Sequence, residues 1–155
     1  MRCKNVAFLS EENQREIKTI FDQLDHDVHL EFFTERESPI IIPGGNCPTC
    51  KDTRLLLQEV VALSDKLHLD VHEVTTTGEA ARQQGIDRIP ALIMSAEGVQ
   101  GKIRYFGLPS GYEFSVLIGS LVDVSRAEAD LADETNEVLS KLDKGVHIQV
   151  FVTPT

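Results

Sequence analysis

Two cysteines separated by two residues are the part of this sequence best suited to chemistry. Cys47 and Cys50 lie in the stretch GGNCPTCK, with Pro48 and Thr49 between them. Such a pair is typical of a redox-active dithiol, of half of a zinc site, or of two buried and unreactive thiols. The chain holds three cysteines, too few for a disulfide scaffold, so the pair indicates catalysis or metal binding.

The place of the pair at the start of a predicted helix favours redox chemistry. Pro48 suits the first helical position, because its missing N–H would be unpaired there anyway. The positive end of a helix stabilises the thiolate, which is the reactive form of cysteine. We therefore expect Cys47, at or just before the helix start, to be the nucleophile, and Cys50, one turn in, to be the resolving thiol. The helix is indicated by an apolar stripe of Leu56, Val60, Leu63 and Leu67.

A zinc site is the main alternative interpretation of the cysteine pair. A structural zinc needs four ligands, commonly a second C-x-x-C or two histidines. The third cysteine, Cys3, lies far away in the sequence. His68 and His72 have a suitable separation, but the pattern places them across a helix end and a strand, so we do not expect them to share a face. No bound metal or cofactor is therefore expected.

Hydrophobic periodicity predicts an α/β domain whose sheet is mixed, with four to five strands flanked by helices. The first predicted strand passes through a loop into the cysteine-bearing helix, where open α/β folds place functional groups. Strands separated by helices predict a parallel pair, and a late hairpin adds antiparallel strands. The predicted helices cover 11–24, 50–68, 79–85 and 111–125, and the strands cover 28–35, 69–75, 89–94 and 102–107.

The last thirty residues repeat the opening pattern of a helix followed by a strand. We expect residues 1–125 to form a first unit, and residues 126–155 to be the opening helix and strand of an incomplete second unit. A strand without neighbours exposes its edges and apolar faces. We therefore expect HIQVFVT, residues 147–153, to pair with a sheet edge in its own unit or in a second copy of the chain, forming a homodimer.

Composition narrows the class of partner. The formal net charge of −10 argues against nucleic-acid and anionic-membrane partners. No apolar run approaches the length of a membrane span, and the N-terminal residues have no apolar core of signal-peptide length. We expect a cytoplasmic protein.

The combination of motifs resembles the thioredoxin and glutaredoxin fold. A strand leads to C-P-x-C at a helix start, then come a strand, a helix, and I-P-A-L before a hairpin. The stretches GIDRIPALIM, RYFGLPSGYEF, LVDVSR and VHIQVFVTPT resemble more specifically the glutaredoxin-like protein disulfide oxidoreductases of thermophilic archaea and bacteria. Those proteins carry two thioredoxin units, each with its own C-x-x-C, so the resemblance implies a chain truncated before the second pair.

The resemblance implies roles for particular residues. Cys47 and Cys50 match the redox pair, and Pro48 and Thr49 lie between them on the surface that meets the substrate. Pro90 matches a proline that is cis and lies beside the sulfurs in this fold. The backbone of Ile89 would then pair with an extended peptide of the substrate.

Two further features bear on the site. Glu31 lies in the middle of an apolar strand, where thioredoxins place a buried acid that helps to deprotonate the resolving cysteine, so it is a candidate proton acceptor. The loop over 35–46 is longer than the connection in the family, and its three isoleucines could cover the site or form an ordinary surface loop.

We predict a thiol–disulfide oxidoreductase that acts on protein disulfides and is re-reduced by a thiol reductant such as a thioredoxin-reductase-like enzyme. One alternative is an electron-relay domain for a peroxiredoxin. Another is a non-enzymatic assembly module whose cysteines hold zinc or bridge an iron–sulfur cluster.

Overall fold

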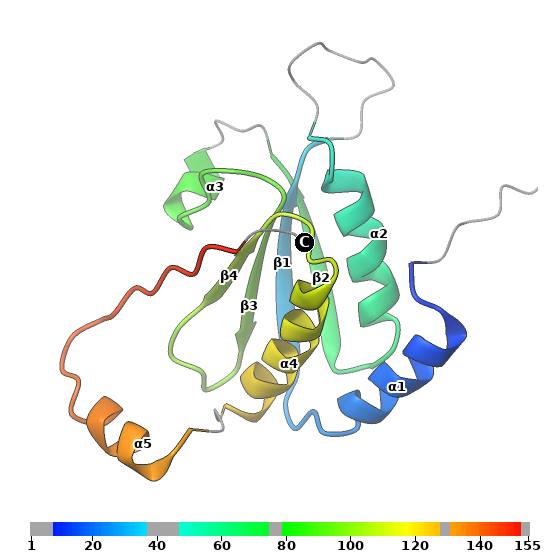
Figure 1. Cartoon of the computed structure of the whole chain (residues 1–155). Helices are drawn as coiled ribbons and strands as arrows, with labels where there is room; N and C mark the ends of the chain where they lie inside the picture. The colour runs from blue at the N-terminus through cyan, green and yellow to red at the C-terminus, as the bar shows by residue number, and fades with distance from the viewer. Residues whose placement is uncertain (1–7, 37–46, 75–78, 128–130, 153–155) are drawn as a thin grey trace, which may run out of the picture.

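The central strand of the sheet is built from the apolar run that follows the first helix. The computed structural model describes residues 8–36, 47–74, 79–127 and 131–152. Figure 1 shows the helices and strands in chain order. They are α1 (Glu11–Phe21), β1 (Val28–Thr34), α2 (Cys50–Val61), β2 (Leu67–Glu73), α3 (Glu79–Gln83), β3 (Ala91–Ala96), β4 (Ile103–Phe106), α4 (Tyr112–Arg126) and α5 (Asp133–Leu139).

The four strands form one mixed sheet in the order β2-β1-β3-β4. β1 pairs in parallel with β2, from Val28 opposite Leu67 to Thr34 opposite Glu73. β3 runs antiparallel to β1 and forms a hairpin with β4. The predicted parallel pair and late hairpin are confirmed, and so is the mixed sheet flanked by helices.

The two faces of the sheet are covered differently. Side chains alternate along a strand, and the even-numbered residues of β1 enter a core shared with α1, α2 and α4. Figure 1 shows α4 crossing in front of the sheet. The odd-numbered side chain of Phe33 instead packs in a smaller cluster that includes α3. The larger core contains Val28, Leu30, Phe32, Leu56, Leu57, Val60, Leu117 and Leu121.

Local signals in the sequence explain several element boundaries. Ser10 precedes α1, and its hydroxyl accepts a hydrogen bond from the Asn13 N–H at 3.1 Å, as a capping residue does. Gly85 ends the turn after α3 with a φ of 76°, in the left-handed region that glycine adopts without steric cost. Tyr105 of β4 donates to Glu113 of α4 at 3.2 Å, and burial raises the pKa of Tyr105 to about 12.

The expected placement of two histidines was wrong. β2 begins at Leu67, two residues earlier than predicted, because the parallel register with β1 starts opposite Val28. His68 and His72 therefore both lie on β2, four residues apart and on one face. His68 lies 3.2 Å from Asp27, and His72 lies 3.6 Å from Glu31. In the part of the chain that the structure describes, no three His, Cys, Asp or Glu side chains are grouped to hold a metal.

The C-terminal segment differs from its prediction within a single chain. No strand forms over residues 145–152, and α5 buries none of its residues. The apolar side chains of Val146, Ile148, Val150, Phe151 and Val152 are 60–84% exposed. A strand needs a partner for its backbone groups, and within the described residues this segment does not join the sheet. Pairing within the same unit was therefore a wrong prediction, whereas pairing with a second copy stays a prediction.

The described helices include none whose length and apolar character would let it cross a bilayer.

We expect the core between α2 and the sheet to be sensitive to truncation. Leu57 of α2 is fully buried, whereas Leu55 on the same helix is 38% exposed. Leu57→Ala should lower the free energy of unfolding by about 2–5 kcal/mol, because it removes buried methyl groups and leaves a cavity. Leu55→Ala should change it by less than about 1 kcal/mol. Urea unfolding of the three proteins measures both, and equal losses would contradict the assigned faces of α2.

Candidate active site

The two cysteines form a disulfide at the start of α2. The sulfurs of Cys47 and Cys50 are 2.12 Å apart, and the Cα atoms are 5.5 Å apart. Cys50 is only 5% exposed, whereas Cys47 is partly exposed. One sulfur-bearing residue therefore faces solvent and the other is shielded, which is the asymmetry that a nucleophile and a resolving thiol require.

The helix starts later than expected. The Thr49 carbonyl accepts the first helical hydrogen bond from the Thr53 N–H at 2.9 Å, and the Thr53 hydroxyl donates to the same carbonyl at 2.8 Å. Cys50 is therefore the first residue of α2, and Thr49 is its N-cap. Pro48 lies in the turn before the cap and not at the first helical position, and Cys50 is not one turn into the helix. Both cysteines consequently lie at the positive end of α2.

The second part of the site is the segment that enters β3. The Ile89–Pro90 peptide bond is cis, as the resemblance implied. Ala91 pairs with Phe33, so Pro90 lies beside the carboxyl end of β1, from which the chain continues toward Cys47. The Pro90 carbonyl accepts from the Gly107 N–H at 2.9 Å. Within the described residues, the Ile89 backbone takes part in no backbone hydrogen bond, so it is available for another strand.

A charged and aromatic pair flanks that segment. Arg88 donates to both carboxylate oxygens of Asp87 at 3.0 Å, and its guanidinium carbon lies 5.7 Å from the centre of the Phe106 ring. The hydrogen bond from Arg88 lowers the pKa of Asp87 from its ordinary value. Arg88 and Phe106 thus present a cation and an apolar ring next to Ile89.

The structure does not bring Glu31 to the disulfide. Its carboxylate accepts from Gln84 at 3.0 Å and lies 3.6 Å from His72. By strand alternation it shares the face of Phe33, which α3 covers, whereas α2 packs on the other face. The role of Glu31 as a proton acceptor stays a prediction.

Glu35 is a site residue that the sequence did not single out. Its Oε2 accepts a hydrogen bond from the backbone N–H of Cys47 at 2.5 Å. It comes directly after the end of β1, at the sheet edge where α/β folds gather functional groups, and that position was the available signal. A carboxylate, not only a helix end, therefore acts on Cys47.

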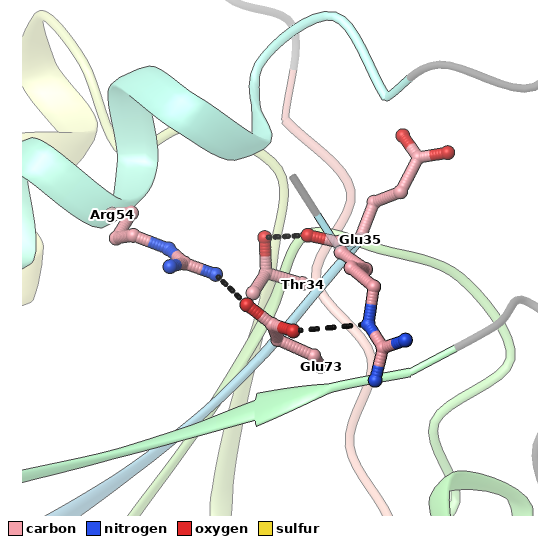
Figure 2. A network of polar contacts seen from close by, with 5 residues as sticks. Thr34, Glu35, Arg54 and Glu73 are labelled. Atoms are coloured by element: carbon pink, nitrogen blue, oxygen red, sulfur yellow. Dashed lines mark hydrogen bonds and ion pairs between the residues drawn. The ribbon is translucent and has the colours of Figure 1, made fainter. Parts of the chain in front are cut away.

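An ion-pair network lies beside Glu35 at the carboxyl ends of the parallel strands. Glu73 accepts from Arg54 of α2 at 3.3 Å and from Arg36 at 3.4 Å. Figure 2 shows the pair of Arg54 with Glu73, and the Glu35 side chain pointing away from it. The Thr34 hydroxyl makes a long contact of 3.5 Å with the Glu35 carbonyl. These contacts tie α2 to the ends of β1 and β2.

Two sequence features lie outside the described residues. They are Cys3 and most of the long loop, residues 37–46, which includes the three isoleucines.

Comparison with known proteins places this arrangement in a family. The family described as thioredoxin domain matches residues 39–119, which is just over half of the chain. The chain belongs to the thioredoxin domain family, and the predicted thioredoxin-like fold is confirmed.

Curated relatives point to larger redox proteins. The chain is 32% identical over 87 residues to the alkyl hydroperoxide reductase AhpF of Xanthomonas campestris pv. phaseoli, covering 54% of this chain and 14% of that protein. It is 21% identical over 121 residues to an NADH dehydrogenase of Bacillus subtilis, covering 78% of this chain and 21% of that protein. The chain thus spans about a fifth or less of the length of these relatives.

Solved structures share the fold. A protein disulfide oxidoreductase from Aeropyrum pernix has a TM-score of 0.67 at 24% identity, over 86% of this chain and 55% of that one. The alkylhydroperoxide reductase AhpF of Enterococcus faecalis has a TM-score of 0.71 at 21% identity, over 88% of this chain and 62% of that one. At these identities the likeness shows the fold.

Exposure predicts which thiol reacts first. We expect limiting iodoacetamide to label Cys47 of the reduced protein roughly ten times faster than Cys50, because Cys50 is buried in the first turn of α2. Peptide mass spectrometry of early time points measures the ratio. Equal labelling, or a preference for Cys50, would show that the two thiols are not divided as nucleophile and resolving thiol.

Proposed function

We propose that this protein is a thiol–disulfide oxidoreductase that acts on disulfides of other proteins. The observation that carries the proposal is the Cys47–Cys50 disulfide at the positive end of α2, with one cysteine partly exposed and the other buried. Membership of the thioredoxin domain family supports the same chemistry. A reducing compartment such as the cytoplasm would keep the pair available as a dithiol.

The proposed reaction proceeds by two thiol–disulfide exchanges. The Cys47 thiolate attacks a sulfur of the substrate disulfide, forming a mixed disulfide and releasing one substrate thiolate. The Cys50 thiolate then attacks the Cys47 sulfur, closing the internal disulfide and releasing the second substrate thiolate. Each released thiolate takes up a proton, so the substrate gains two electrons and two protons. An external dithiol reductant returns the enzyme to its reduced form, and the reverse sequence would oxidise a substrate.

We assign substrate contact to the surface around the disulfide. Pro48 and Thr49 lie between the cysteines, and the backbone of Ile89 before Pro90 is available to pair with an extended peptide. Main-chain pairing of this kind recognises an extended segment with little dependence on its sequence. It therefore suits an enzyme that acts on many protein disulfides.

The relatives favour a second candidate, an electron-relay domain. The 32% identity to the Xanthomonas alkyl hydroperoxide reductase covers 54% of this chain. In that case a reductase would supply the electrons, and the dithiol would pass them to a peroxide-reducing partner such as a peroxiredoxin. Stimulation of peroxide consumption in a reconstituted system, without reduction of insulin, would favour the relay over the general reductase.

The proposed activity predicts the outcome of insulin reduction by dithiothreitol. The wild-type protein should accelerate the turbidity that reduced insulin chains produce, and Cys47→Ser should abolish the acceleration, because no other thiol can attack the substrate. Cys50→Ser should also lose turnover, because the mixed disulfide is not resolved. Zinc and iron are quantified in the same preparations.

Two results would contradict the proposal. One is equal activity of wild type and Cys47→Ser. The other is inactivity of all three proteins together with stoichiometric zinc or iron, which would favour the metal-binding assembly module.

We further propose that residues 146–152 pair with an outer sheet strand of a second copy of the chain. The segment is apolar, exposed and unpaired within the described chain, while the outer strands β2 and β4 each expose apolar side chains. Val150→Asp should shift the molar mass in light scattering from dimer toward monomer. Val116→Asp, at an exposed valine of α4, is the matched control. A wild-type monomer at all concentrations would contradict the pairing.

A further inference from the structure

The hydrogen bond between Glu35 and Cys47 joins a carboxylate directly to the reactive cysteine. Glu35 Oε2 lies 2.5 Å from the backbone nitrogen of Cys47, and the contact is partly buried. The two residues are twelve positions apart, so the contact depends on how the chain returns from the end of β1 to the start of α2. It is not a local turn contact.

The nearest arginines do not neutralise this carboxylate. Arg36 and Arg54 both pair with Glu73, which lies between them at the end of β2. Within the described residues, Glu35 forms no ion pair, and Figure 2 shows its side chain directed away from Arg54 and Glu73. The charge of Glu35 therefore acts on its surroundings with little compensation.

A negative charge at this place has opposite consequences for the two redox states. The disulfide is uncharged, so the carboxylate does not destabilise it. The reduced form owes part of its stability to the Cys47 thiolate, which the end of α2 favours and a nearby carboxylate opposes. Glu35 also occupies the Cys47 N–H, which is then not free to donate to a thiolate.

We propose that Glu35 is a positioning residue that holds Cys47 and displaces the dithiol–disulfide equilibrium toward the disulfide, which makes the pair a stronger reductant. The proposal rests on the proposed function, because it assumes that the pair cycles between the two states. Reduction follows a balanced exchange in which two glutathione molecules deliver two electrons and two protons and leave as one glutathione disulfide.

The test is the equilibrium of the full chain with defined mixtures of reduced and oxidised glutathione. The fractions of dithiol and disulfide are read by alkylation and mass spectrometry, so no catalytic activity is needed. Glu35→Gln keeps an oxygen acceptor and removes the charge. We expect it to raise the equilibrium constant for reduction by roughly three- to tenfold. Alkylation of Cys47 should also reach half of its maximal rate at a lower pH.

Three variants separate charge from structure. Glu35→Asp keeps the charge and should lie closer to wild type than Gln does, whereas Glu35→Ala should shift the equilibrium in the same direction as Gln. Glu97→Gln makes the same charge change in the exposed turn after β3, at the other end of the sheet, and should leave the equilibrium unchanged. Thermal melting of each oxidised variant checks that the fold is kept.

Each outcome decides something. An unchanged equilibrium in Glu35→Gln, or an equal shift in Glu97→Gln, would overturn the role of Glu35 while leaving the redox activity standing. A wild-type pair that does not interconvert with glutathione at any ratio would overturn the proposed function, and the role of Glu35 with it.

Discussion

The site depends on the burial of β1 at the centre of the sheet. Val28, Leu30 and Phe32 are completely buried, and burial of such a side chain contributes about 1.5–3 kcal/mol. Pairing with β2 on one side and β3 on the other fixes where this strand ends. Its carboxyl end leads to Glu35 and then toward Cys47, while the pairing with β3 brings Pro90 to the same end. The reactive groups therefore meet because a single strand is packed tightly from both sides.

The chemistry follows from differences that this frame imposes on two identical residues. Cys50 is the first residue of α2 and is covered by the packing of that helix, whereas Cys47 precedes the N-cap and is partly exposed. The helix end favours a thiolate at this place, and the Glu35 carboxylate opposes it. The balance between these two influences sets how readily the pair gives up electrons. A single carboxylate can thus adjust the potential without any change to the C-P-T-C motif.

Most of the fold was predictable because its signals are local. The apolar run of β1, the Ser10 cap, the stripe on α2 and the glycine after α3 each act over a few residues. The cis bond at Pro90 was predictable only through the resemblance, since most X–Pro bonds are trans. The start of β2 was misplaced because the register with β1, not local propensity, decides it. Pro48 was misplaced because the Thr53 hydroxyl and N–H fix Thr49 as the cap.

The contact between Glu35 and Cys47 could not be read from the sequence, because it closes a loop of twelve residues and depends on tertiary structure. The exposed segment at 145–152 illustrates the opposite limit. Its alternating pattern is typical of a strand, but a strand forms only where an edge is available to pair with it. Local pattern therefore identified the cysteines and the elements that carry them. Packing decided which carboxylate reaches them and which face Glu31 occupies.

The most direct measurement is the trapping of a mixed disulfide with a protein substrate. Reduced Cys50→Ser is mixed with insulin, and the products are separated without reductant and identified by mass spectrometry. We predict a covalent adduct through Cys47 that accumulates because no resolving thiol is present, and no adduct with Cys47→Ser. An adduct formed equally well through Cys50 in Cys47→Ser, or none in either variant, would contradict the assignment of Cys47 as the nucleophile of a thiol–disulfide oxidoreductase.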